Sequence, residues 1–191
     1  MTAQVLDRTL HGFRIGDPDS RFPIFSAEGS RHFPGRWNTA RTPLVYASEH
    51  YSTAMLEKLV RGAGEMPPNQ HFIEIEIDAG LTYEVFSAPA HPGWEDASGA
   101  VARAFGEQWA LESRSLLLIA PSVVARMENN LMLNPAHPEF TRVRHGLDQP
   151  VWWDQRLFAS GSTVSRKPRR AARVALVARP DHEGRREGED G

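Results

Sequence analysis

Strand-like segments outnumber helix-like segments in this chain of 191 residues, and the two kinds do not alternate regularly. The clearest strand is predicted at residues 71–78, where apolar and polar residues alternate with a period of two. Shorter strands are predicted at 44–47, 81–86, 116–120, 131–133, 141–144 and 151–153. A doubly wound parallel sheet needs strands and helices in regular alternation. The pattern therefore predicts an α+β fold with a mixed, mostly antiparallel sheet and a few helices.

Two helices are predicted among these strands. Ser52 is a suitable N-cap for a helix that runs to about Arg61 and ends at Gly62. The apolar residues of this helix are expected to face the core and to leave Glu57 on the rim of the buried face; they are Met55, Leu56, Leu59 and Val60. A second helix is predicted at about 97–111.

The loops and turns are predicted from glycine and proline. The first 43 residues are rich in both and are expected to be mostly loop. Residues 81–86 are expected to pair with the strand at 71–78 through a turn at 78–80.

Composition limits the class of protein. There is no cysteine, which excludes disulfides and thiolate metal sites. The start of the chain has no basic segment followed by an apolar one, and the apolar runs are too short to span a bilayer. These features favour a cytoplasmic protein that does not enter a membrane.

Charge divides the chain into a body and a tail. Residues 1–158 carry a formal charge of about −5 and contain no linker, so they are predicted to form one domain. Residues 159–191 carry about +3, with basic residues followed by acidic ones, and are predicted to be disordered because they hold little apolar surface. A nucleic-acid-binding arm is the alternative interpretation of this tail.

Several common sites are excluded by the absence of their motifs. No G-x-G-x-x-G, G-x-x-x-x-G-K-[ST] or G-x-S-x-G motif occurs. The eight histidines are scattered, with no pair spaced i, i+4. A Rossmann dinucleotide site, a P-loop and a bound metal are therefore not expected.

Three polar residues of complementary chemistry, Arg36, Tyr46 and Glu57, lie within 22 residues. They come from a predicted loop, strand and helix, and they supply a cation, a phenol and a carboxylate. An arginine fork can bind phosphate or ribose oxygens, and a carboxylate can stabilise developing positive charge.

Each of these residues also has an ordinary structural explanation. Glu57 could form a surface ion pair with Arg61 at i+4, and Tyr46 could pack in the core with its hydroxyl bonded. Arg14, next to an aromatic residue, is equally ambiguous, and Ser122 could cap a turn or bind a ligand.

The combination resembles the RES domain, a family named for its Arg, Glu and Ser. The resemblance begins with Gly35-Arg36-Trp37-Asn38, residues 44–48 and residues 54–57. It continues through residues 118–122 and 129–140 to a closing segment at 154–158, and so covers roughly residues 10–158 in order. Pro34 stands where a second glycine is expected.

The resemblance implies a toxin of a type II toxin–antitoxin pair that consumes NAD+, with a fold similar to ADP-ribosyltransferase toxins. It implies that Arg14 and Arg36 bind the dinucleotide and that Tyr46 packs near the nicotinamide. Glu57 would be the key carboxylate and Ser122 a ligand contact. NAD+ would be the substrate, with no prosthetic group, and the partner would be an Xre-type antitoxin that blocks the site.

The implied reaction breaks the nicotinamide–ribose bond through an oxocarbenium-like state. Nicotinamide leaves as a neutral molecule, so one carboxylate suffices. The sequence does not identify which molecule accepts the ADP-ribose group. Water or phosphate would deplete NAD+, whereas a host protein would become ADP-ribosylated. An RNA-cleaving toxin and a non-catalytic binding module are the other classes considered. The net negative body disfavours direct binding of nucleic acid.

Overall fold

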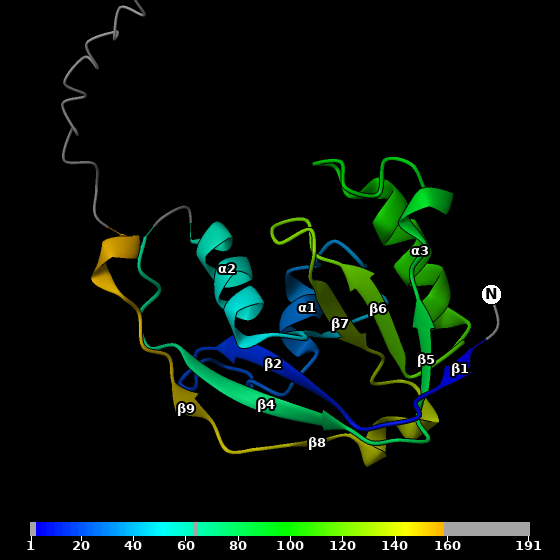
Figure 1. Ribbon diagram of the computed structural model, residues 1–191, viewed down its shortest axis with the longest axis horizontal. Helices are drawn as coiled ribbons and strands as arrows, with labels where there is room; N and C mark the ends of the chain where they lie inside the picture. The colour runs from blue at the N-terminus through cyan, green and yellow to red at the C-terminus, as the bar shows by residue number, and fades with distance from the viewer. Residues whose placement is uncertain (1–2, 63–64, 159–191) are drawn as a thin grey trace, which may run out of the picture. The chain divides into compact units, whose positions relative to one another are not determined.

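The computed structural model describes residues 3–62 and 65–158. The predicted disorder of the tail at 159–191 lies outside the described residues. Within them, strands form one mixed sheet in the order β1-β5-β6-β7-β3-β2-β4-β8, with β9 also paired to β4 (Figure 1). The strands are β1 Gln4–Val5, β2 Leu10–Gly16, β3 Val45–Ser48, β4 His71–Ile77, β5 Thr82–Val85, β6 Leu117–Pro121, β7 Asn129–Leu133, β8 Arg144–His145 and β9 Gln149–Pro150.

The helices of the described residues are few. The α-helices are α1 Glu28–His32, α2 Tyr51–Arg61 and α3 Ala100–Leu111, and the short 3-10 helices are Ala88–Ala90, Pro138–Arg142 and Gln155–Leu157. All strand pairs are antiparallel except β5 with β6. The predicted α+β class, with a mostly antiparallel sheet, is confirmed. No helix among the described residues has the length and apolar content needed to cross a membrane.

The sheet has apolar residues on both faces in its centre. Leu117 and Leu131 belong to one buried cluster, with the isoleucines of β4. Leu118 and Met132 point the other way, into a second cluster with Trp109 of α3. A strand buried on both faces reads as a continuous apolar run, as β6 does. Figure 1 shows α3 beside β5 and β6, and α2 over β2.

The predicted pairing of β5 with β4 is wrong. Both edges of β4 are occupied, by β2 on one side and by β8 and β9 on the other. The turn after β4 instead carries the chain to β1, where Gly80 N–H donates to Leu6 O over 2.8 Å. Gly80 has a φ of 83°, which suits glycine. β5 therefore lies between β1 and β6.

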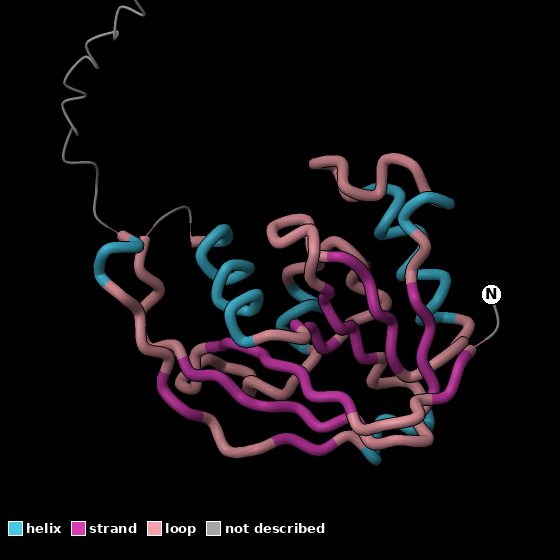
Figure 2. Tube along the Cα trace, in the orientation of Figure 1, coloured by secondary structure: helices cyan, strands magenta, loops and turns pink. Residues whose placement is uncertain are grey.

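Strand β2 lies in the segment that was predicted to be mostly loop. It pairs with β4 along its whole length, from Leu10↔Ile77 to Gly16↔His71. A Cβ at Gly12 would lie 2.9 Å from Leu131 Cδ1, so this glycine permits close packing inside a strand. Most of the chain between β2 and β3 is irregular, as Figure 2 shows.

Two further strand predictions near the end of the domain are wrong. A strand was predicted at 141–144, but residues 138–142 form a 3-10 helix and the strand β8 covers only Arg144–His145. Residues 151–153 form no strand, and β9 lies just before them.

The buried face of α2 also differs from the prediction. Leu56 is 43% exposed and Val60 is 61% exposed, whereas Thr53 and Ala54 are buried. The small side chains let the helix pack closely against β2 and β3. The side of α2 that carries Ala54, away from the predicted apolar face, consequently turns towards the sheet.

Candidate functional site

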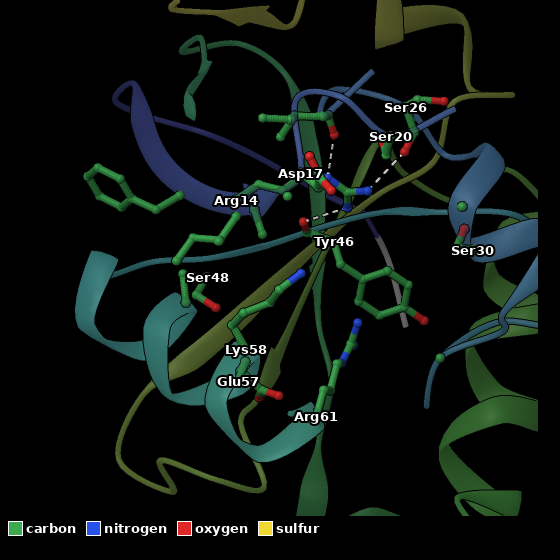
Figure 3. A pocket seen from close by; sticks show the side chains of 18 of the residues that line it. Arg14, Asp17, Ser20, Ser26, Ser30, Tyr46, Ser48, Glu57, Lys58 and Arg61 are labelled. Carbon is green, nitrogen blue, oxygen red and sulfur yellow. Dashed lines mark hydrogen bonds between the residues drawn. The ribbon is translucent and has the colours of Figure 1, made fainter. Parts of the chain in front are cut away.

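A cavity of about 440 Å³ lies between β2, β3, α2 and the segment that joins β2 to β3. This volume is typical of small-molecule sites, which span roughly 300–1,000 Å³. Among its lining residues are three of the predicted site residues, Arg14, Tyr46 and Glu57 (Figure 3). In the described part of the chain, His, Asp and Glu side chains form no group of three or more that could hold a metal.

One face of α2 supplies a wall of this cavity. Ala54, Glu57, Lys58 and Arg61 all line it. Their spacing of i, i+3, i+4 and i+7 places them on a single helical face. The small Ala54 brings the helix close to the sheet, and the three longer side chains reach into the cavity. The wall therefore presents two cations and one carboxylate.

The carboxylate of Glu57 is held by two side chains from distant parts of the sequence. Its Oε1 accepts a hydrogen bond of 2.8 Å from Ser122 Oγ and one of 2.6 Å from Asn130 Nδ2. Ser48 Oγ donates to Asn130 Oδ1 over 2.7 Å and so fixes the amide. Oε2 has no hydrogen-bonding partner among residues 3–62 and 65–158, which leaves it available to a ligand.

Ser122 is fully buried at the end of β6. Its Oγ accepts hydrogen bonds from the backbone N–H groups of Val124 and Ala125, at 3.1 and 3.0 Å. The hydroxyl thus both caps the turn after β6 and donates to Glu57. The turn cap is therefore present, whereas the predicted contact of Ser122 with a ligand stays a prediction, because Ser122 is not among the residues that line the cavity.

The guanidinium of Arg14 is bound to backbone carbonyls. Nε, Nη1 and Nη2 donate to the oxygens of Ile24, Tyr46 and Ser26, at 2.5, 2.9 and 3.0 Å. These bonds join β2, β3 and the segment between them. Burial, and then repulsion from Arg61, lower the pKa of Arg14 to about 10. The side chain remains a cation at neutral pH, with no carboxylate bound to it among the described residues.

Tyr46 stands on β3 with its ring along the cavity, and its hydroxyl is held by the loop at 35–38. The hydroxyl donates to Asn38 Oδ1 over 2.8 Å and accepts from Trp37 N–H over 3.1 Å. Burial raises the pKa of the Tyr46 phenol far above its ordinary value. The phenol therefore stays protonated, and the ring is fixed in orientation.

Gly35 makes this arrangement possible, and its replacement gives a testable prediction. A Cβ at residue 35 would lie 2.7 Å from the Tyr46 hydroxyl oxygen and 2.8 Å from its Cζ. Because that ring is tethered, we expect Gly35→Ala to lower the free energy of unfolding by about 1–3 kcal/mol. Urea denaturation measures the loss. Gly146→Ala is the matched control, because its Cβ would meet only Glu74 O at 3.9 Å. Equal stability of both variants would contradict the packing argument.

Arg36 is not among the lining residues of the cavity. Its Nη1 donates to the carbonyl oxygens of Trp94 and Asp96, at 2.9 and 2.7 Å. The loop at 35–38 turns this side chain towards the segment before α3, while Gly35 itself lines the cavity. The structure thus brings Arg14, Tyr46 and Glu57 to one cavity, with Ser122 bonded to Glu57. It directs Arg36 to the neighbouring loop, and the predicted contact of Arg36 with the dinucleotide stays a prediction.

Lys58, Arg61 and Asn130 were not singled out from the sequence. The ion pair of Glu57 with Arg61, considered as the ordinary explanation, is not formed in the described residues. Lys58 and Arg61 follow Glu57 at one and four residues. Once the buried face of α2 is known, this spacing indicates that both side chains lie on the same side of the helix as Glu57. Asn130 has no comparable local signal, because it meets Glu57 only through the pairing of β7 with β3.

A second hollow, of about 620 Å³, holds none of the five predicted site residues. It is lined by residues of α1, the end of α3 and the segment after β7, including Arg31 and Arg41. Arg31 is paired there with Glu28 over 3.2 Å. The smaller cavity, with its held carboxylate, is the candidate functional site.

Comparisons with known proteins agree with the predicted resemblance. The Prs ADP-ribosylating toxin of Sphingobium sp. (strain YBL2) is 38% identical over 119 residues, covering 60% of this chain and 74% of that protein. A Toxin Res from Pseudomonas putida is 30% identical over 123 residues, covering 63% of this chain and 83% of that protein.

A solved structure shows the same fold. A chain of the M. tuberculosis MbcT–MbcA toxin–antitoxin complex matches with a TM-score of 0.61 at 14% identity, covering 77% of this chain and 86% of that chain. A family model described as the RES domain matches residues 11–154. Because this match extends over most of the sequence, the chain belongs to the RES-domain family.

Proposed function

We propose that this protein is the toxin of a toxin–antitoxin pair and that it cleaves the nicotinamide–ribose bond of NAD+. The observation that carries the proposal is the carboxylate of Glu57, held through Oε1 in a cavity that also presents three cations. The relative named Toxin Res supports the assignment as a toxin, and the relative named Prs ADP-ribosylating toxin supports the use of an ADP-ribosyl donor.

Glu57 stabilises the positive charge that develops on the ribose as the nicotinamide–ribose bond breaks. As nicotinamide departs with the bonding electron pair, positive charge develops on the ribose C1′ and ring oxygen. A fixed carboxylate stabilises that charge more in the transition state than in the substrate. Its Oε2 accepts a hydrogen bond from a ribose hydroxyl and so orients the sugar. Nicotinamide leaves neutral, and the nucleophile then bonds to C1′ and loses its proton to solvent.

Tyr46 and Arg14 shape the surroundings of the reacting sugar. The tethered ring of Tyr46 offers an aromatic face to the cationic pyridinium. Arg14 joins β2 to β3 through its carbonyl contacts and adds a positive charge beneath the cavity, which favours an anionic substrate. Ser122 and Asn130 keep the carboxylate in place.

The cleavage is tested by incubating the full-length protein with NAD+ and measuring nicotinamide release. We expect release by the wild type. A fall of at least about tenfold in Arg36→Ala would support the contact with the dinucleotide that the sequence predicts, since only Nη1 of Arg36 is bonded to the loop at 94–96. Arg41→Ala, in the second hollow, is the matched arginine control. No nicotinamide release by the wild type would overturn the proposed function. Full activity of Arg36→Ala would restrict Arg36 to holding the loop at 94–96.

The acceptor distinguishes depletion of NAD+ from modification of a protein. Water or phosphate as acceptor yields free ADP-ribose or its 1″-phosphate, and this is the first candidate. The name of the 38% identical relative favours a second candidate, transfer of ADP-ribose to a protein. NAD+ labelled in the adenosine moiety, incubated with and without phosphate and cell extract, separates the three products. RNA added to the same reaction should remain intact.

The proposed partner is an antitoxin of the Xre type that blocks the cavity. The support is the solved toxin–antitoxin complex whose chain shares this fold. Co-expression of the adjacent gene product, followed by co-purification and loss of nicotinamide release, tests this pairing.

A further inference from the structure

We propose that Lys58 and Arg61 form an anion subsite that binds the pyrophosphate of the dinucleotide. This inference rests on the proposed function and assigns a substrate group to two residues of α2. Both side chains line the cavity. Figure 3 shows them extending from α2 towards the strands that carry Arg14 and Tyr46.

The two cations lack bound anions. In the described ranges, neither the Lys58 ammonium nor the Arg61 guanidinium forms a hydrogen bond or an ion pair. Two carboxylates, Glu57 and Asp17, line the cavity, and neither forms an ion pair with Lys58 or Arg61 in the described residues, although Asp17 attracts Lys58 at longer range. Glu57 Oε1 accepts from Ser122 and Asn130, and Asp17 Oδ1 accepts from Asp19 N–H and Asn69 Nδ2. The positive charge on this wall is therefore left for a ligand.

The other candidate arginines, Arg14 and Arg36, are bonded to backbone carbonyls, Arg14 through all three guanidinium nitrogens and Arg36 through Nη1. Arg14 directs one donor of each guanidinium nitrogen to backbone carbonyls. Arg36 donates to the loop at 94–96, outside the lining of the cavity. Within residues 3–62 and 65–158, Lys58 and Arg61 are thus the cations of the cavity that have all their donors available to a phosphate.

Local electrostatics agree with an anion at this position. Burial, then repulsion from Arg61 and from Arg14, lower the pKa of Lys58. Three like charges that repel one another inside a cavity are stabilised by a polyanion placed among them. A pyrophosphate supplies two negative charges to that space.

The spacing of the residues suits a dinucleotide. Side chains at i and i+3 of a helix lie about 5–6 Å apart at Cβ, close enough to contact two linked phosphates. Glu57 and Arg61 are spaced i, i+4 and line the same cavity as Lys58, so a ribose at the carboxylate would have its 5′-phosphate near the cations. One turn of α2 would then contact both the sugar and the pyrophosphate.

The experiment compares NAD+ with nicotinamide riboside, which has the same scissile bond but no pyrophosphate. We expect Lys58→Ala and Arg61→Ala each to raise KM for NAD+ about tenfold or more, because each removes charge-assisted hydrogen bonds. We expect kcat/KM for nicotinamide riboside to change less than about twofold. Lys58→Arg should restore NAD+ binding, and Arg41→Ala should leave both substrates unaffected.

A general structural role predicts a different outcome. If the variants lose activity equally on both substrates, or keep the wild-type KM for NAD+, the subsite is refuted. Binding of ADP-ribose, measured by calorimetry on the full-length protein, separates this proposal from the proposed function. Should the wild type release no nicotinamide, tight ADP-ribose binding that both alanine variants weaken still supports the subsite. Absent or unchanged binding overturns it.

Discussion

Glutamine in place of Glu57 is expected to lower the rate of nicotinamide release by about 10²–10³-fold. The amide keeps the size of the side chain, and its oxygen can still accept from Ser122 and Asn130. It lacks the negative charge that stabilises the developing oxocarbenium ion. The loss should therefore appear mainly in kcat, while KM for NAD+ changes little.

Glu49→Gln is the matched control for this experiment. Glu49 also accepts a hydrogen bond from an asparagine, Asn129, over 2.9 Å, but it does not line the cavity. Thermal denaturation of both variants shows whether the fold is retained. A Glu57→Gln protein with near wild-type kcat would remove the carboxylate from the mechanism.

Alanine in place of Gly106 is expected to lower the free energy of unfolding by about 3 kcal/mol or more. Gly106 lies in α3, and a Cβ there would stand 2.0 Å from Trp37 O and 2.8 Å from Trp37 C. The obstacle is backbone, which cannot rotate away. The helix would have to move out of the cluster around Trp109, which is fully buried.

Gly29→Ala is the control for Gly106→Ala. Gly29 lies in α1, and a Cβ there meets nothing within 4 Å. Alanine favours helix over glycine by about 1 kcal/mol, so this variant should be neutral or slightly more stable. Urea denaturation of the two variants should give shifts of opposite sign or of very different size. Comparable unfolding midpoints for Gly106→Ala and Gly29→Ala would contradict the prediction, because α3 would then be able to shift away from Trp37 without loss of stability.

Much of the fold followed from local patterns in the sequence. Period-two alternation placed β4 correctly, and the glycine at residue 62 marked the end of α2. The fold class followed from the count and order of such segments. These features depend on residues close together in the chain, which is why they could be predicted.

What could not be predicted depends on contacts between distant segments. β2 was missed because its glycines resemble loop punctuation, although Gly12 permits close packing against Leu131 and Gly16 against Ile24. The buried face of α2 was misjudged because its contact with the sheet uses small residues rather than the apolar stripe. The direction of the Arg36 side chain depends on how the 35–38 loop wraps around Tyr46, which no spacing reveals.

The bonds that hold Glu57 have a consequence during synthesis. The carboxylate is translated early, on α2, whereas its asparagine partner comes 73 residues later, on β7. A nascent or prematurely terminated polypeptide that stops before β7 contains the carboxylate but not the amide that fixes it. The ribosome must therefore synthesise the chain through β7 before the carboxylate can be fixed in the geometry of the folded site.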